Sequence, residues 1–297
     1  MRGRFGPSKL TMAIYLLPGL ALFVFVVLGP VVTSIYYSTF DWHGGAVMDF
    51  AGFKNYVAMF NDPLFWQSFQ NNVFLTVFCL IGQLGLAFLF AMILNYKGLW
   101  GRTIHRAVAY FPVTLSAVVV GFVWTMIFEY NTGLINLFLH AIGAEDAVKV
   151  WLATEDTIMT VISIPLVWQY IGFYVVIILA AMTSISPDVL EMAELDGANA
   201  FRRAWFVVLP LVKNTIIVCV MLCIAGNMRA FDHIYAMTRG GPGYSSNVMA
   251  LYSYNVSFMQ TNMGYGAALS IGALVISMII VVGSRAILNR GTKDVEV

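Results

Sequence analysis

Charged residues are unusually rare in this sequence. Only 10% of its 297 residues are Asp, Glu, Lys or Arg, whereas 60% are hydrophobic. A soluble domain carries about 25% charged residues. The formal net charge of +1 gives no electrostatic reason to expect nucleic acid as a partner. The composition therefore predicts an integral membrane protein in contact with lipid.

Cysteine is scarce as well. The three cysteines, Cys79, Cys219 and Cys223, all lie within apolar runs, which excludes the disulfide framework of a small secreted domain. Cys219 and Cys223 are four residues apart and share one face of a helix, but no His or carboxylate lies near them in the sequence. Packing in a helical core is therefore the interpretation, and no metal site is expected.

The sequence motifs of catalysis and of nucleotide hydrolysis are missing. There is no G-x-x-x-x-G-K-[ST] loop to hold nucleotide phosphates, no H-E-x-x-H and no G-x-S-x-G. The four histidines lie outside the apolar runs: His43, His105, His140 and His233. An enzyme embedded in the membrane would gather such groups at depth, so we do not expect this chain to be an enzyme.

Six apolar runs are present, each close to the roughly 20 residues that a helix needs to cross a bilayer. They cover residues 10–37, 72–94, 107–128, 157–182, 207–228 and 265–287. The fold class predicted is an all-α integral membrane protein with six transmembrane helices. Pro18 and Pro30 are expected to bend the first of them.

The distribution of basic residues predicts the orientation. Twelve of the sixteen Lys and Arg residues fall on one side if residues 95–106, residues 183–213 and both chain ends share that side. They are Arg2, Arg4, Lys9, Lys97, Arg102, Arg106, Arg202, Arg203, Lys213, Arg285, Arg290 and Lys293. The excess of basic residues in cytoplasmic loops then places both termini in the cytoplasm. The acidic loop 129–156 falls outside.

The predicted spans themselves carry no Asp, Glu or Lys near their centres. A carrier driven by protons or sodium needs ionisable groups at that depth, so a secondary carrier is only a remote alternative. A passive channel would show rings of charge or a filter loop, and neither is visible. If the chain transports a solute, its energy must come from a partner.

The stretch 183–213 is a water-facing interruption between two apolar runs and carries four acids and two arginines. Ser186 and Pro187 predict the start of a helix, and Gly197 predicts a break between two short helices or a close backbone contact. Two interpretations are open from the residues alone. The stretch is either an interfacial helix that packs under the bundle or a surface for another protein.

At this point the sequence resembles a known family. The membrane subunits of binding-protein-dependent ABC importers carry E-A-A, three residues, G, nine residues, I, one residue and L-P. The segment Glu191-Met192-Ala193-Glu194-Leu195-Asp196-Gly197 is in register with this pattern, as is Leu209-Pro210. Met192 replaces the middle alanine and Val207 the isoleucine, and both changes conserve polarity.

The resemblance implies a type I importer fold in the bacterial or archaeal cytoplasmic membrane. It implies four kinds of partner: a second homologous permease, a dimer of ABC ATPases, an extracytoplasmic solute-binding protein and the substrate. ATP and Mg²⁺ would be bound by the ATPase, with no cofactor in this chain. The seven residues Glu191–Gly197 would form the coupling helix, which inserts into a cleft of the ATPase.

Two further stretches are similar to the carbohydrate-uptake branch, which includes the larger maltose permease subunit and the glycerol-3-phosphate permeases. They are residues 231–242, which end in Gly240-Gly241-Pro242, and Gly264-Tyr265-Gly266-Ala267-Ala268. The similarity implies a transmembrane core at 70–290, between an N-terminal region 1–69 with the first span and an extracytoplasmic loop, and a cytoplasmic tail 291–297. A sugar or oligosaccharide is the expected substrate, and glycerol-3-phosphate or a related compound is the alternative.

Candidate residues for the substrate path come from the fourth and fifth spans. Counting back from Gly240 and from Pro187, the resemblance makes Asn227 and Tyr174 counterparts of sugar-contacting residues. Aromatic faces and amides suit a sugar, which adds Trp168, Gln169 and Tyr170. Buried amides also tie neighbouring helices together, so this second interpretation stays open. Arg229 is the cation that a phosphate substrate would favour.

Overall fold

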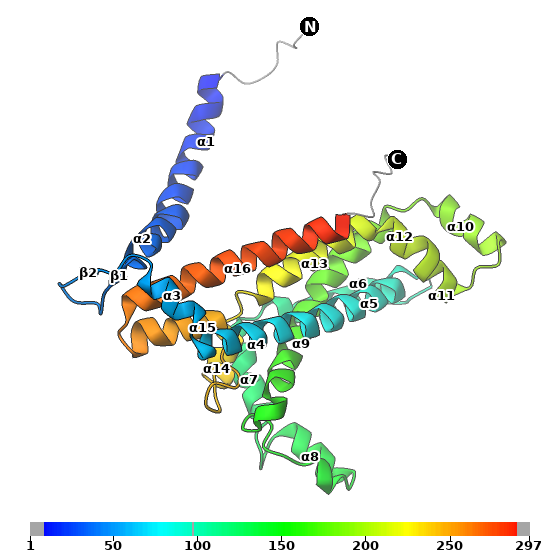
Figure 1. Ribbon diagram of the computed structural model, residues 1–297. Helices are drawn as coiled ribbons and strands as arrows, with labels where there is room; N and C mark the ends of the chain where they lie inside the picture. Colours follow the sequence, from blue (N-terminus) through cyan, green and yellow to red (C-terminus); the bar gives the residue numbers. More distant parts are fainter. Residues whose placement is uncertain (1–8, 97, 290–297) are drawn as a thin grey trace. The chain divides into compact units, whose positions relative to one another are not determined.

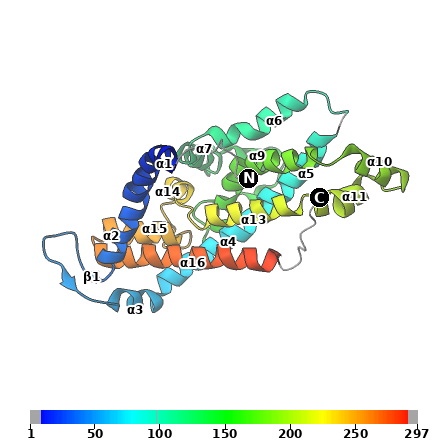
Figure 2. The same cartoon turned by 90° about the horizontal axis from the view of Figure 1, so that it is seen from above.

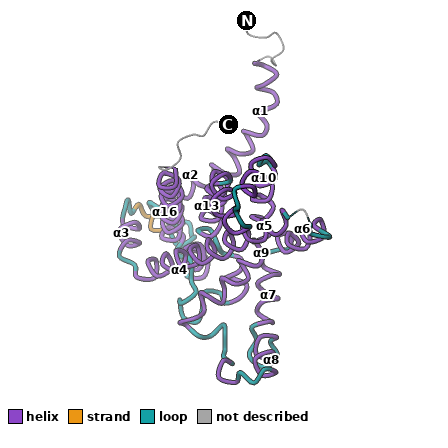
Figure 3. Tube along the Cα trace, turned by 90° about the vertical axis from the view of Figure 1, so that its right-hand side faces the viewer, coloured by secondary structure: helices purple, strands orange, loops and turns teal. Residues whose placement is uncertain are grey.

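The computed structural model describes residues 9–96 and 98–289 of the chain (Figure 1). The predicted tail 291–297 and the basic residues Arg2, Arg4, Lys97, Arg290 and Lys293 lie outside the described residues. The described chain is almost entirely helical, with one short pair of strands (Figure 3). It divides into two compact units, one from the described residues of Met1–Asp62 with Ser253–Leu274, the other from those of Pro63–Tyr252 with Val275–Val297. The predicted all-α class is confirmed.

Unit 1 holds the first span and a small hairpin. Its N-terminal elements are α1 (Lys9–Phe23), a π-helical turn (Val24–Leu28), α2 (Gly29–Tyr37), β1 (Phe40–Asp41), β2 (Asp49–Phe50) and α3 (Lys54–Phe60). β1 and β2 pair antiparallel, with Phe40 opposite Phe50. The π turn comes directly before Gly29-Pro30. Because Pro30 has no N–H and its ring crowds the preceding turn, a widened turn there accommodates it.

The glycines of the second stretch similar to the carbohydrate-uptake branch are explained by contacts inside unit 1. They lie in the first turn of α16 (Met263–Asn289), which follows α15 (Met249–Tyr254) and the π turn Asn255–Met259. A Cβ on Gly264 would clash with the Phe40 carbonyl, and one on Gly266 with the Ser257 hydroxyl. The Gly264 N–H donates to the Trp42 carbonyl at 2.9 Å. Only glycine allows this close approach.

Unit 2 contains the remaining elements. In chain order they are α4 (Pro63–Cys79), a π turn (Leu80–Gly85), α5 (Leu86–Asn95), α6 (Arg102–Tyr110), a 3-10 turn (Phe111–Thr114), α7 (Ala117–Ile127), α8 (Leu134–Ala141), a 3-10 turn (Glu145–Ala147), α9 (Glu155–Thr183), α10 (Pro187–Leu195), α11 (Ala200–Arg203), a π turn (Ala204–Val208), α12 (Leu209–Leu211), α13 (Lys213–Asn227) and α14 (Asp232–Met237).

Two of the six predicted spans are not straight helices. Among the residues that the structure describes, four helices are long and apolar enough to cross a membrane: Leu10–Tyr37, Pro63–Asn95, Glu155–Thr183 and Met263–Leu288. The predicted span 107–128 is bent by 98° between Arg102–Thr114 and Ala117–Ile127, and the span 207–228 by 76° between Ala200–Leu211 and Lys213–Asn227. Counting each bent pair as one span, the described chain has the six that were predicted.

The predicted basic loop 95–106 is also corrected. Arg102, His105 and Arg106 lie in α6 rather than in a loop. The helix begins directly after Gly101, whose φ of 70° turns the chain. The Arg102 side chain closes this turn, because its Nε donates to the Leu94 carbonyl at 2.8 Å.

α9 is the central helix of unit 2, with α4, α5, α6 and α13 packed against it. Lipid gives little hydrophobic drive for helices to associate, so their close packing depends on small residues. Gly172 of α9 lies against the backbone of α6, where a Cβ would clash with the Ala109 carbonyl oxygen. A Cβ on Gly82 would come within 2.7 Å of the Val167 side chain. Glycine at these positions therefore sets how closely α9 and its neighbours approach.

Candidate functional site

Two short helices meet at Gly197, in the stretch that we call the 187–203 segment. α10 ends in a Schellman motif: the Ala198 N–H donates to the Ala193 carbonyl, and the Gly197 N–H to the Glu194 carbonyl, both at 3.0 Å. Gly197 has a φ of 78°, in the left-handed region that glycine adopts without strain. The predicted break at Gly197 is confirmed.

An ion pair and a helix cap join the two helices. The Arg203 guanidinium pairs with the Glu194 carboxylate, which links α11 back to α10. The Asn199 side chain accepts the Arg202 N–H at 2.9 Å and so caps α11. A partly exposed ion pair of this kind contributes about 1 kcal/mol at most. Its main effect is to fix the geometry of the 187–203 segment.

The apolar side chains of the 187–203 segment are uncovered. Leu195 is 88% exposed, Phe201 68% and Met192 57%, and the carboxylate-bearing Glu191 is exposed beside them. Both views of unit 2 place α10 and α11 at one end of it (Figures 1 and 2). Large apolar side chains grouped with acids on a protruding segment are the features of a protein-docking surface.

A second group of polar side chains lies inside unit 2, around Cys223. Asn227, at the end of α13, is 6% exposed, and its Nδ2 donates to the Cys223 carbonyl at 2.8 Å. Tyr174 of α9 is 5% exposed and lies near the Cys223 thiol. The same thiol donates to Gln83 Oε1 at 3.3 Å. The structure thus brings the two predicted path residues, Asn227 and Tyr174, to one cluster from two helices.

The three neighbouring candidates of α9 divide between two places. The Gln169 amide is 1% exposed; its Nε2 donates to the Leu115 carbonyl at 2.8 Å, and its Oε1 lies 2.6 Å from Nε2 of His233. The Tyr170 ring also meets His233, edge to face at 6.2 Å. Trp168 is 41% exposed and lies apart from that group. Gln169 therefore ties three segments together, and its part in a substrate path stays a prediction.

His233 is a site residue that reasoning from the sequence missed. It lies in α14, is 4% exposed, and burial lowers the pKa of its imidazole to about 4. Because the Gln169 Nε2 already donates to Leu115, its Oε1 is the acceptor and His233 donates from Nε2–H. A neutral imidazole with the proton on Nε2 is thereby fixed. It lies in the stretch 231–242 that resembles the carbohydrate-uptake branch, but nothing in the sequence singles out the histidine within that stretch.

Asn72 is the other residue that was missed. It is fully buried, its Nδ2 donates to the Asn227 carbonyl at 3.0 Å, and its Oδ1 accepts the Met249 N–H at 2.8 Å. Its position at the start of a predicted span was the sequence signal that could have indicated this role.

Among residues 9–96 and 98–289, no group of three or more His, Cys, Asp or Glu side chains is close enough to bind a metal ion.

Residues 83–293 match a family model described as the binding-protein-dependent transport system inner membrane component. The match includes the 187–203 segment and both helices of the Cys223 cluster.

Individual relatives cover most of the chain. The sulfoquinovosyl glycerol transport system permease SmoG of Agrobacterium fabrum is 29% identical over 275 residues, 91% of this chain and 88% of its own. The diacetylchitobiose uptake system permease NgcF of Streptomyces coelicolor is 28% identical, over 88% of this chain and 77% of its own. A bacterial alginate ABC transporter, solved with a periplasmic protein holding an alginate pentasaccharide, has the same fold (TM-score 0.81, 21% identity, 94% of this chain and 93% of that one).

Proposed function

The chain belongs to the family of binding-protein-dependent transport system inner membrane components, and from this premise we propose how it works. It is a multi-pass permease subunit of an ABC importer in the cytoplasmic membrane. In our proposal it forms a path with a second, homologous permease. An ATPase dimer drives the path, an extracytoplasmic protein supplies the solute, and the solute is a neutral sugar or oligosaccharide.

The observation that carries the proposal is the uncovered 187–203 segment. Leu195, Phe201 and Met192 are more than half exposed, which is costly in water unless a partner covers them. The chain has no nucleotide-binding loop of its own, so a partner ATPase, with ATP and Mg²⁺ bound to it, is the source of energy. Glu191 is available to pair with a basic group at the rim of the ATPase cleft.

The connections of the 187–203 segment support a mechanical role. α9 ends at Thr183, just before it, and α11 runs on through the π turn and α12 to α13. These two helices carry Tyr174 and Asn227 respectively. A displacement of the segment is therefore passed along the backbone to both sides of the Cys223 cluster. Within the segment, the Arg203–Glu194 pair links α11 to α10 and the Asn199 side chain caps α11.

Polar but uncharged side chains around the Cys223 cluster favour a neutral substrate. Asn227 and Tyr174 offer amide and hydroxyl groups that suit sugar hydroxyls. Arg229, the cation that glycerol-3-phosphate would require, is exposed, and its Nε is engaged by the Ala225 carbonyl at 3.0 Å. Relatives in the same family are named for sulfoquinovosyl glycerol and for diacetylchitobiose, which supports a saccharide and leaves its identity to the binding protein.

Copurification tests the proposed assembly. The chain would be expressed with its neighbouring genes, extracted in detergent and purified through a tag on this chain alone. We expect a second permease and an ATPase in the same complex. A chain that emerges alone and still transports a solute in liposomes without ATP would overturn the proposal in favour of a carrier.

The substrate path needs its own test. In the purified importer, Asn227→Ala should weaken uptake of the solute without reducing the yield of the complex. Gly226→Ala is a matched control on the same helix, because a Cβ at that position meets nothing within 4 Å. Unchanged uptake kinetics in Asn227→Ala would remove Asn227 from the path.

A further inference from the structure

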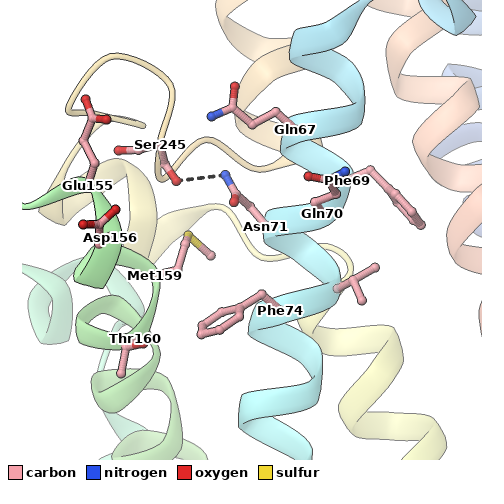
Figure 4. Close-up of a pocket in the computed structure, with 11 residues that line it drawn as sticks. Gln67, Phe69, Gln70, Asn71, Phe74, Glu155, Asp156, Met159, Thr160 and Ser245 are labelled. Atoms are coloured by element: carbon pink, nitrogen blue, oxygen red, sulfur yellow. Dashed lines mark hydrogen bonds between the residues drawn. The ribbon is translucent and has the colours of Figure 1, made fainter.

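A pocket with both polar and apolar lining lies between α4 and α9 (Figure 4). Its volume is about 690 Å³, within the range of small-molecule sites. Gln67 and Gln70 of α4 line one wall, and Glu155, Asp156 and Thr160 of α9 line the other. None of the five predicted path residues contributes to it. The pocket is therefore separate from the Cys223 cluster.

The position of the pocket along α9 places it at the outer end of the path. Glu155 is the first residue of this 29-residue helix and Thr183 the last, just before the 187–203 segment. At about 1.5 Å per residue, roughly 40 Å separates the two ends. Because the 187–203 segment is the side proposed to meet the ATPase, the pocket lies on the side from which the solute arrives.

One wall of the pocket is fixed by hydrogen bonds. The Asn71 Nδ2 donates to the Ser245 carbonyl at 3.0 Å and to the Asn247 carbonyl at 2.8 Å, which pins the 245–247 loop to α4 (Figure 4). Asn71 and Ser245 both line the pocket. This wall of the pocket is thus held in place, which reduces the conformational entropy lost when a ligand binds against it.

The chemistry of the lining suits hydroxyl-rich molecules. Amides of Gln67 and Gln70 donate and accept at once, as sugar hydroxyls do, while Phe74 gives an apolar face for C–H groups. Glu155 and Asp156 accept hydrogen bonds, and none of the described Lys, Arg or His residues lines the pocket to balance their charge. Anionic ligands are therefore repelled at short range.

The surface around the pocket is too polar to lie against lipid. Gln67, Gln70 and Thr160 are exposed in the first turns of helices that are long enough to span a bilayer. Polar groups at such positions face water or protein, because hydrocarbon offers them no hydrogen bond.

We propose that this pocket is an outer subsite that receives neutral saccharide rings and rejects saccharides with carboxylate groups. This inference rests on the proposed importer function and narrows its substrate class.

Protection from thiol labelling tests the pocket directly. Thr160→Cys would be made in the complete importer, purified without its binding protein and without ATP; the three native cysteines are buried. An uncharged, water-soluble maleimide reports access to the new thiol. The probes are maltotriose, which is neutral, and trigalacturonate, which carries three carboxylates. Leu137→Cys in α8, where the side chain is 48% exposed, is the control outside the pocket.

We expect maltotriose to slow labelling of Thr160→Cys at least threefold and trigalacturonate to leave it unchanged. Adding Glu155→Gln and Asp156→Asn should let trigalacturonate protect the thiol as well, whereas Leu137→Cys should respond to neither sugar. Ready labelling that neither sugar slows would overturn the subsite. Equal protection by both sugars in the parent complex would overturn the selection by charge.

Two further outcomes separate this inference from the function on which it rests. If the thiol reacts in the isolated chain but not in the complete importer, the second permease covers this face and the subsite is wrong. If maltotriose does not protect the Thr160→Cys thiol while uptake still depends on ATP, the proposed subsite is wrong and the importer function stands. The labelling assay needs neither ATP nor the binding protein, so failure of the proposed function would not mimic either result.

Discussion

Asn72 Nδ2 donates to the Asn227 carbonyl at 3.0 Å, while its Oδ1 accepts the Met249 N–H at 2.8 Å. One fully buried amide of α4 thereby fixes the end of α13 to the start of α15. The candidate path residue Asn227 owes its position to this contact. A polar group removed from such a place leaves others unpaired, which costs about 1–3 kcal/mol.

Asn72→Ala should therefore lower the stability of the purified complex by about 1–3 kcal/mol, because the Met249 N–H loses its acceptor. A thermal shift read by size-exclusion chromatography measures the change. Asn61→Ala is the matched control, since Asn61 is exposed and only its own helix accepts from it, through the Val57 carbonyl at 2.8 Å. If the unfolding temperature fell equally in both variants, Asn72 would not have the positioning role described.

The close contact between α6 and α9 predicts the effect of a single methyl group. Gly172→Ala should reduce the yield of folded protein sharply, because the new Cβ would clash with the Ala109 carbonyl. Gly226→Ala adds the same group where nothing lies within 4 Å, and should be neutral or slightly stabilising, since Ala exceeds Gly in helix propensity by about 1 kcal/mol. Equal yields of the two variants would contradict the packing described.

Gly197→Asp tests the docking surface. The left-handed backbone adds a local cost of about 1–2 kcal/mol, but a Cβ at Gly197 meets no described residue within 4 Å. The chain should insert normally and uptake should be lost, because the new side chain occupies space that the ATPase fills.

Gly143→Asp controls for the backbone strain in that experiment. Gly143 has a φ of 73°, and a Cβ there also meets nothing within 4 Å, but it lies in the loop after α8. Uptake should survive in this variant. If Gly197→Asp kept full uptake, the coupling role of the 187–203 segment would be wrong.

His233 should make stability depend on pH. Its folded-state pKa of about 4 lies below the ordinary value of 6.5, so the unfolded chain binds the proton first. The contribution of the neutral imidazole to the free energy of unfolding is fully present above pH 6.5. It is lost as the pH falls towards 4, and the total loss is about 3 kcal/mol. Thermal unfolding of the wild type should weaken over this window more than that of His233→Gln, whose amide can still donate to Gln169. Parallel pH profiles would contradict the burial of a neutral imidazole.

Apolar length predicted where helices lie, but not where they bend. The fourth run, predicted at 157–182, is observed as Glu155–Thr183, because a long apolar stretch in lipid has no alternative to a helix. The third and fifth runs are bent by 98° and 76°. The predicted runs 107–128 and 207–228 are apolar on both sides of these breaks, so their length alone does not reveal a bend. After the first bend, Gly121 of α7 packs against α14, where a Cβ would come within 2.9 Å of the Ala236 side chain, and such contacts between distant residues are not visible in a hydropathy pattern.

The parts of the candidate site that depend on neighbouring residues in the sequence were predicted, and the contacts between residues far apart in the sequence were not. The E-A-A pattern located the 187–203 segment, and Gly197 predicted its break, because a turn is specified by neighbouring residues. The Arg203–Glu194 pair and the bond from Gln169 to His233 join residues that are 9 and 64 positions apart. Only the folded chain brings such pairs together, so no pattern of spacing could have indicated them.

The dependence of uptake on ATP tests the central claim most directly. The complete importer would be reconstituted in liposomes, with the saturated binding protein on one side and ATP with Mg²⁺ on the other, and uptake of labelled saccharide would be followed with time. We predict accumulation only when ATP and the binding protein are both present, and none with Gly197→Asp. Accumulation without ATP, driven instead by an ion gradient, would contradict the account.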